Sequence, residues 1–200
     1  MQFITHPMTE VKDYLEVYTE ATPNPETMKF VFNKMILPGE TADFPTKESA
    51  ANGMSPLAQN LYEFNFVNGV FIMNNFVTIT RLPGMEWEDI IPVIKAFLKS
   101  YMEAGEPVVR EIPAQLKTDF GEDEPVVNKI REILDTYVKP AVEVDGGLIS
   151  FKDYENGIVT VVLQGSCSGC PSSTVTLKRG IESMLTKMVP EVKEVIAESL

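Results

Sequence analysis

The chain has two cysteines, Cys167 and Cys170, which stand three positions apart in GSCSGCPSS, residues 165–173. Thiolate sulfur is a soft ligand for zinc and for iron–sulfur clusters, and it is also the nucleophile of thiol–disulfide exchange. A zinc or cluster site built of cysteine alone needs four sulfurs, and one chain offers two. The spacing therefore predicts either a metal site that two chains share or a dithiol that works within one chain.

The cysteine pair stands between a predicted strand, residues 158–164, and a predicted helix that begins at Pro171. Backbone N–H groups and the positive end of the dipole at a helix start favour thiolate over thiol. Gly165 and Gly169 leave room for the backbone to bend around a bulky ligand and to direct amides at its sulfurs. Pro171 suits the first helical position, where no N–H is needed. We therefore predict a reactive loop rather than two inert packing thiols.

The residues favour the shared metal site over two alternatives. A twofold dimer with the cysteine loops facing each other would supply the missing sulfurs and place the metal on the symmetry axis. A thioredoxin-like dithiol normally follows a βαβ unit, whereas these cysteines follow a predicted hairpin. A structural zinc clasp would not need a second domain. The dithiol is kept as the main alternative.

The elements around the cysteines follow from hydrophobic periodicity and turn signals in residues 122–200. An apolar stripe at steps of three and four predicts a helix that begins at Pro125 and ends at Pro140. Strands are predicted at 148–154 and 158–164, joined by an Asn-Gly turn. The helix after the cysteines should stop before Pro190, and a last strand is expected within 191–198. The predicted order is helix, strand, strand, helix, strand.

The first half of the chain has the same mixture of elements without a recognisable site. Strands are predicted at 14–20, 29–35, 69–73 and 76–81. One helix is predicted to begin at Ser55, and a second helix is predicted over 87–102. Pro92 lies inside the second predicted helix, and proline is unfavourable in a helix interior, so it is the weak point of this prediction. The one histidine, His6, lies far in sequence from both cysteines and is not expected to be a ligand. No phosphate-binding loop, HExxH pair or GxSxG motif occurs.

Prolines, glycines and acidic residues interrupt every periodic pattern between the two halves. We read residues 105–121 as a linker between a domain at 1–104 and a cluster-binding domain at 122–200. The predicted class is α+β, with two small α+β domains joined by this Pro/Gly/acid-rich linker.

Composition narrows the cellular setting. Lys and Arg number 17 against 29 Asp and Glu, so the net charge is −12. Because a polyanion would be repelled and no basic stripe offsets the charge, nucleic acid is not an expected partner. The apolar runs are far shorter than the ~20 residues of a membrane-spanning helix. The amino terminus carries no visible secretory signal or transit peptide, and two cysteines are too few for a disulfide framework, so we expect a cytoplasmic protein.

Longer stretches carry a family resemblance. VKPAVEVDGGLISF, GIVTVVLQGSCSGCPSSTVTLKRGIESML and VPEVKEV resemble the NifU carboxy-terminal domain of Nfu-type iron–sulfur proteins. YTEATPNPETMKF, SPLAQNLYEF and VFIMNNFVTITRLPGMEWEDI resemble the Nfu amino-terminal domain. The resemblance covers almost the whole chain in the expected domain order. One departure is Leu148, where the family usually has an acid after Asp-Gly-Gly. We read Asp145, Gly146 and Gly147 as a helix-to-strand connection and not as ligands.

The resemblance implies a scaffold or carrier and not an enzyme. It implies a 4Fe-4S cluster, with 2Fe-2S as the other type, held between two chains by Cys167 and Cys170 and handed to apo-iron–sulfur proteins. The loaded form would be a homodimer that also meets the cluster assembly machinery. Two ligands from each subunit hold a cluster less firmly than four from one fold, as transfer requires. The amino-terminal domain would recognise clients or chaperones, or fold back and shield the cluster.

Overall fold

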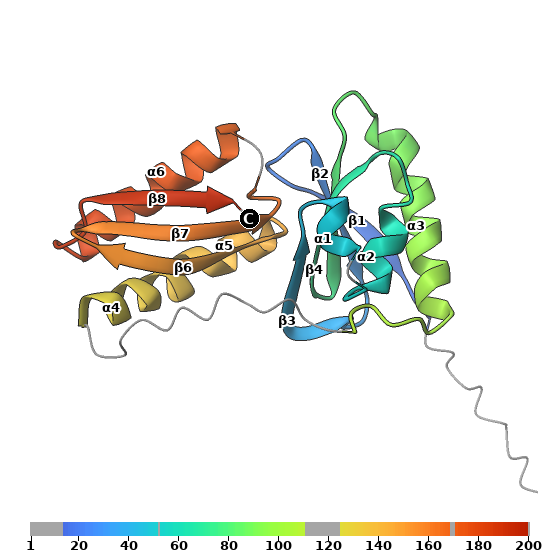
Figure 1. Ribbon diagram of the computed structural model, residues 1–200, viewed down its shortest axis with the longest axis horizontal. Helices are drawn as coiled ribbons and strands as arrows, with labels where there is room; N and C mark the ends of the chain where they lie inside the picture. Colours follow the sequence, from blue (N-terminus) through green and yellow to red (C-terminus); the bar gives the residue numbers. More distant parts are fainter. Residues whose placement is uncertain (1–13, 52, 111–124, 169–170, 200) are drawn as a thin grey trace, which may run out of the picture.

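The computed structural model describes residues 14–51, 53–110, 125–168 and 171–199, and for residues 171–173 the backbone alone. These residues form two α+β domains, which confirms the predicted class (Figure 1). Among the described residues, no helix is long and apolar enough to cross a membrane.

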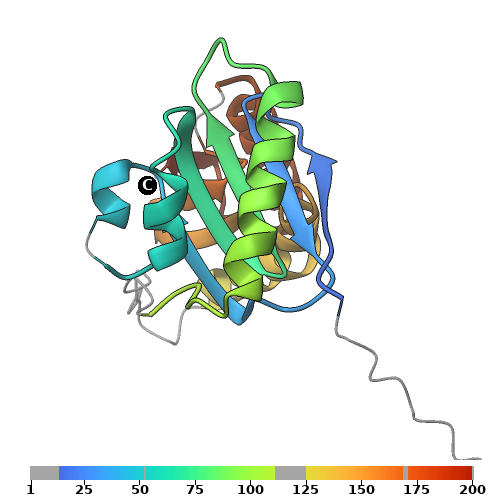
Figure 2. The same ribbon diagram turned by 90° about the vertical axis from the view of Figure 1, so that its right-hand side faces the viewer.

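The first domain is a five-stranded antiparallel sheet with its longest helix on one face. The strand order is β1-β2-β5-β4-β3, and the helix α3 lies along the sheet in both ribbon views (Figures 1 and 2). The elements are β1 (Val17–Ala21), β2 (Thr27–Phe32), β3 (Leu37–Phe44), α1 (Lys47–Ala50), α2 (Pro56–Leu61), β4 (Val67–Asn74), β5 (Phe76–Arg81) and α3 (Trp87–Glu103).

The central strands of this sheet, β2, β4 and β5, bury side chains on both faces, since successive side chains point to opposite sides and both sides are covered. On β2, Phe30 and Phe32 belong to the large core that α2 and α3 cover. Val31, between them, belongs to a smaller cluster on the opposite face. That cluster is completed by Phe71, Met73, Phe76 and, from the second domain, Leu148.

Two elements of the first domain were not predicted. The strand β3 was not predicted, because Pro38 and Gly39 interrupt its alternation, and its pairing with β4 shifts between Leu37 and Thr41. The short helix α1 was also missed. The helix predicted over 87–102 is confirmed as α3, and it continues through Pro92 because its buried residues Ile90, Ile94 and Leu98 anchor it to the sheet on both sides of the proline.

The second domain has a three-stranded sheet in the order β6-β7-β8, antiparallel between β6 and β7 and parallel between β7 and β8. The Asn156-Gly157 hairpin forms as predicted, with positive φ at both residues. The elements are α4 (Pro125–Ile133), the π-helical η1 (Leu134–Val138), α5 (Lys139–Val144), β6 (Gly147–Glu155), β7 (Ile158–Gly165), α6 (Pro171–Met188) and β8 (Glu194–Ser199).

The prediction that Pro140 ends the first helix of this domain is wrong. The helical run passes through the π-turn η1 and continues as α5 to Val144. Pro140 becomes the second residue of α5. The first turn of a helix has N–H groups without intrahelical partners, so proline is tolerated there.

The start of the predicted linker lies against the first domain. The Ser55 hydroxyl donates to the Val108 carbonyl at 2.6 Å, and the Arg110 N–H donates to the Met54 carbonyl at 2.7 Å. Val108 and Val109 pack against the large core. The rest of the predicted linker, residues 111–121, falls outside the described residues, so the domain boundaries remain predictions.

Candidate functional site

The candidate site is the segment from Gly165 to Ser168, which we call the cysteine loop. It follows β7 and leads in sequence to Gly169 and Cys170, which fall outside the described residues. The helix α6 then begins at Pro171, as predicted. In the sheet, Gly165 pairs with Gly147, the first residue of β6. The loop therefore lies beside the turn between α5 and β6.

That turn, Asp145 and Gly146, holds the cysteine loop through backbone contacts. The Ser166 N–H donates to the Gly146 carbonyl at 3.2 Å, and the Ser166 hydroxyl donates to the Asp145 carbonyl at 2.6 Å. A Cβ on Gly147 would lie 2.9 Å from the Cys167 Sγ. The Asp-Gly-Gly segment is thus the predicted helix-to-strand connection, and it also provides the space that the thiol occupies.

The cysteine loop is closed by its own hydrogen bonds. The Ser168 N–H and hydroxyl both donate to the Gly165 carbonyl, at 3.1 and 2.8 Å. The Thr174 hydroxyl donates to the Cys167 carbonyl at 3.2 Å and so ties the first turn of α6 to the loop. Gly165 has a φ of +65°, a conformation that favours glycine.

The Cys167 side chain is buried, with 8% of its surface exposed, and belongs to the core of the second domain. Burial raises the pKa of its thiol, and the charge of Asp145 raises it further, while a hydrogen bond with Ser166 lowers it. The expectation that the helix start favours the thiolate of this cysteine is therefore wrong for this arrangement. Desolvation outweighs the effect of a helix start, because the thiol points into apolar surroundings.

A pocket of about 270 Å³ lies beside Cys167, between the two domains. Pro23 and Asn24 line it from the first domain, and Leu177 lines it from α6. The Asn24 side chain donates to the Ser166 carbonyl at 3.1 Å. Asn24 was not among the predicted site residues, because no local pattern could show that it reaches a loop 142 residues away.

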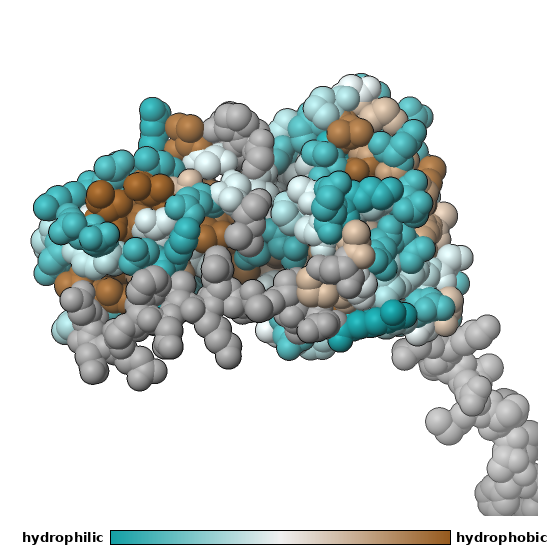
Figure 3. Space-filling view, in the orientation of Figure 1, coloured by the Kyte–Doolittle hydropathy of each residue, from teal (hydrophilic) through white to brown (hydrophobic). Residues whose placement is uncertain are grey.

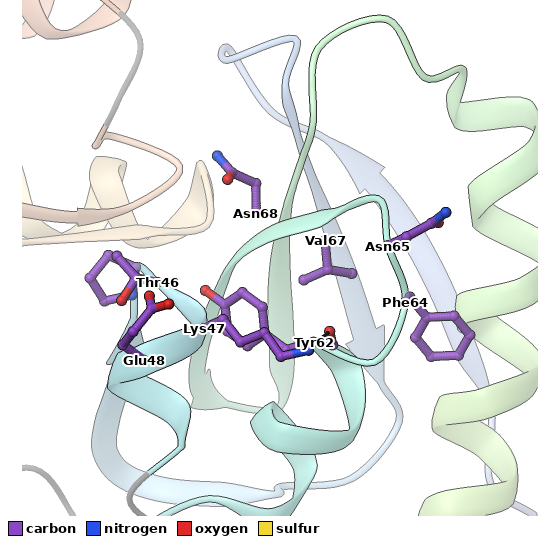
Figure 4. A pocket seen from close by; sticks show the side chains of 9 residues that line it. Thr46, Lys47, Glu48, Tyr62, Phe64, Asn65, Val67 and Asn68 are labelled. Carbon is purple, nitrogen blue, oxygen red and sulfur yellow. Dashed lines mark hydrogen bonds between the residues drawn. The ribbon is translucent and has the colours of Figure 1, made fainter.

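The first domain has a larger pocket, of about 420 Å³, without comparable chemistry. Figure 4 shows Lys47 and Glu48 from α1 and Tyr62 from the segment after α2 around it. Lys47 forms an ion pair with Glu63 at 3.4 Å, and the Tyr62 hydroxyl donates to the Phe44 carbonyl at 2.6 Å. Since these polar groups are engaged within the chain, the cysteine loop remains the candidate site.

The fold and the loop define a two-domain α+β protein whose one cysteine pair lies at the start of a helix. Residues 17–105 match a family model described as "Scaffold protein Nfu/NifU N terminal", and residues 130–196 match "NifU-like domain". The chain belongs to the Nfu/NifU scaffold family, as the sequence resemblance indicated.

Relatives support the same assignment over most of the chain. Human "NFU1 iron-sulfur cluster scaffold homolog, mitochondrial" is 40% identical over 183 residues, which cover 91% of this chain and 71% of that protein. The protein of the same name from Drosophila ananassae is 42% identical over 181 residues, 90% of this chain and 63% of the relative. A solution NMR structure of a NifU-like protein from Saccharomyces cerevisiae is more distant, with 24% identity and a TM-score of 0.44 over 55% of this chain and 98% of that one.

The predicted cytoplasmic location is contradicted by these relatives, whose names place them in mitochondria. The prediction depended on the lack of a visible targeting segment. Such a lack says nothing about location when relatives extend beyond the part that the chain matches.

Proposed function

We propose that this protein is a carrier that binds one 4Fe-4S cluster between two chains, through Cys167 and Cys170 of each, and transfers it to apo-iron–sulfur proteins. The cluster is cargo rather than a resident cofactor. The observation that carries the proposal is the pair of cysteines, three positions apart at the start of α6, in a member of a scaffold family. A 2Fe-2S cluster on the same sulfurs is the other outcome of the experiment below.

The residues present fit such cargo in their donor chemistry. Soft thiolate sulfur is the ligand that iron–sulfur clusters require. Gly147 leaves the space beside the Cys167 sulfur free of a side chain, and Gly165 allows the left-handed turn that begins the loop. A cluster with four protein sulfurs then needs two copies of this chain.

Exposed apolar residues on the two helices that flank the loop and its neighbouring turn, α5 and α6, support an interface with a second copy. Val144, at the end of α5, is 72% exposed, and Val175, in the first turns of α6, is 46% exposed. Figure 3 shows apolar patches over the second domain among hydrophilic side chains. A pair of such domains would cover apolar surface while it brought the cysteine loops together.

The alternative, a thiol–disulfide oxidoreductase that uses the Cys167/Cys170 dithiol, is disfavoured by the burial of Cys167. Oxidoreductases of this kind attack with an accessible thiolate of lowered pKa. Here burial raises the pKa of the Cys167 thiol. We therefore expect the cluster-free protein to reduce insulin disulfides no faster than a small thiol does, and strong reductase activity would favour the oxidoreductase.

Cluster loading and dimerisation should be linked, because neither chain alone supplies four sulfurs. We would follow mass by light scattering, with iron and sulfide content, during anaerobic reconstitution and again after a chelator and an oxidant are added. We expect a cluster-free monomer, a loaded dimer with about two irons and two sulfides per chain, and return to monomer when the cluster is removed. About one of each per chain would indicate a 2Fe-2S cluster.

Two comparisons sharpen this experiment. Cys167→Ser and Cys170→Ser should each abolish stable cluster binding, and Ser183→Ala, at an exposed position of α6 away from the loop, should retain it. Loaded protein should also activate a cluster-dependent apo-enzyme, while cluster-free protein should not. A monomer that holds a full four-iron cluster without an external thiol would contradict the proposal.

A further inference from the structure

The first domain presents an apolar patch on the sheet face opposite α3, and the second domain sits on it (Figure 1). We call this patch the docking face and define it by Val31, Phe71, Met73 and Phe76. Leu148, at the start of β6, packs against it and is 7% exposed. Leu148 pairs with Gln164, which immediately precedes the cysteine loop. The apolar contact therefore lies at the base of the candidate site.

Three buried side chains of the first domain donate to backbone carbonyls around the same site. The Lys29 ammonium donates to the Val144 carbonyl at 3.1 Å, and the Thr78 hydroxyl to the Gly146 carbonyl at 2.8 Å. The Asn24 amide donates to the Ser166 carbonyl at 3.1 Å. All three acceptors belong to the end of α5, the turn after it or the cysteine loop. Carbonyls at a helix end lack intrahelical partners, so Lys29 satisfies one of them with a favourable charge.

Glycines of the second domain let the two surfaces meet at short range. A Cβ on Gly146 would lie 2.8 Å from the Thr78 Oγ1, and a Cβ on Gly165 would lie 2.9 Å from the Phe71 ring. Real Cβ atoms do not make such contacts without displacement of their neighbours. The docking face thus combines apolar packing, three directed hydrogen bonds and a fitted shape, which are the features of a specific interface.

The position of the first domain conflicts with a shared cluster. Pro23 and Asn24 line the pocket beside Cys167, and Asn24 binds the residue that precedes this cysteine. A second chain that brought its own sulfurs to a cluster on Cys167 would have to approach the cysteine loop, which the first domain now contacts. The first domain and a second chain would therefore compete for the region beside Cys167.

We propose that the docking face is a latch, which holds the cysteine loop in a closed, cluster-free form and must release it before two chains can share a cluster. The effect of the latch on cluster loading depends on the function proposed above. The closed arrangement of the two domains does not depend on it. Its occupant is the chain's own second domain. The closed form protects the Cys167 thiol, and the open form exposes it to cargo and to the second chain.

The latch can be tested without any cluster, by the rate at which a maleimide labels Cys167 in a Cys170→Ser background. Thr78→Val removes one hydrogen-bond donor at nearly constant size, and Lys29→Met removes the charged donor. We expect labelling to rise roughly fivefold for Thr78→Val and about tenfold for Lys29→Met, since charged hydrogen bonds are the stronger. Thr19→Val is the matched control: it lies on the edge strand β1, on the sheet face of Val17 that α3 covers, and should leave the rate unchanged.

The outcomes separate the latch from the proposed function. Circular dichroism and thermal melting would show whether a variant keeps its fold, and a misfolded variant is replaced by the other one. Equal labelling rates in the folded variants and the control would overturn the latch. Faster labelling supports it whether or not a cluster can be loaded. With both cysteines restored, the same variants should dimerise several-fold faster during reconstitution, and failure of every form to bind a cluster would overturn the proposed function alone.

Discussion

At the scale of single residues, the unusual group is the Cys167 thiol, which takes the place of a core side chain. It packs in the same cluster as Val142, Leu163 and Ile181. Burial raises its pKa, and the Ser166 hydrogen bond only partly opposes this effect. The raised pKa favours the neutral thiol in the arrangement described here, and a thiol is a weaker nucleophile and metal ligand than a thiolate.

Substitution of Cys167 should reveal this core role as a loss of stability separate from the loss of cluster. We expect Cys167→Ser to lower the free energy of unfolding by about 1–2 kcal/mol, because it buries a hydroxyl among apolar neighbours. Cys167→Ala, which introduces no polar atom, should cost less. Urea denaturation of cluster-free protein measures both. A serine variant as stable as the alanine variant would show that the site is not apolar.

At the scale of elements, the site depends on how β7 ends and α6 begins. Gly165 turns the chain with a positive φ, and the turn at Gly146, which also has a positive φ, lies directly beside it. These two left-handed positions allow the loop and the α5–β6 turn to pack backbone against backbone. The arrangement aims the Cys167 side chain inward.

Two glycine substitutions should have opposite effects on stability. Gly165→Ala should lower the free energy of unfolding by about 2 kcal/mol or more, since it adds left-handed strain of 1–2 kcal/mol and a clash. The added Cβ would lie 2.7 Å from the Gly146 carbonyl oxygen and 2.9 Å from Phe71. Gly180→Ala should raise stability by up to about 1 kcal/mol, because Gly180 lies within α6 with open space around it. Urea midpoints compare the two, and a tolerated Gly165→Ala would contradict the packing described here.

At the scale of the whole molecule, the two domains also meet through a titratable group. Asp43 on β3 forms a side-chain hydrogen bond with Gln164 on β7. Burial raises the pKa of Asp43 to about 7, although the hydrogen bonds from Gln164 and from the Phe44 backbone lower it. Tyr62 lies close to Asp43, and burial raises its pKa above the ordinary value of 10.0, at which the phenol is already neutral over this range. The folded state therefore prefers Asp43 protonated.

This preference predicts that stability falls as pH rises. Asp43 contributes its full stabilisation below its ordinary pKa of 3.8, and this is lost progressively as pH rises towards 7. Between about pH 5 and about pH 8 the wild type should lose on the order of 1 kcal/mol more than Asp43→Asn, a figure reduced for the partial exposure of the carboxyl. Urea unfolding at both pH values tests this, and parallel losses in the two proteins would contradict it.

Local sequence patterns were enough to predict most of the elements and the position of the candidate site. Apolar spacing predicted the helices α3, α4 and α6, the Asn-Gly pair predicted the hairpin of β6 and β7, and the cysteine spacing located the candidate site. The longer motifs indicated the family, which the comparisons confirmed. Each of these signals lies within a few neighbouring residues, where propensity and hydrophobic period act directly.

The tertiary structure alone decided what covers each face and each loop. The residue types predicted a strand over most of β2, but not that the face of Val31 receives Leu148 from the second domain. Helix-start chemistry predicted a thiolate at Cys167, whereas packing buried it as a thiol. The hydrogen bonds between the two domains join residues far apart in the chain: Lys29 and Val144 are 115 positions apart, and Asn24 and Ser166 are 142 positions apart. A local pattern predicts that a side chain is buried. It does not identify the neighbour, because the hydrophobic effect is non-directional and the neighbour depends on how distant segments pack.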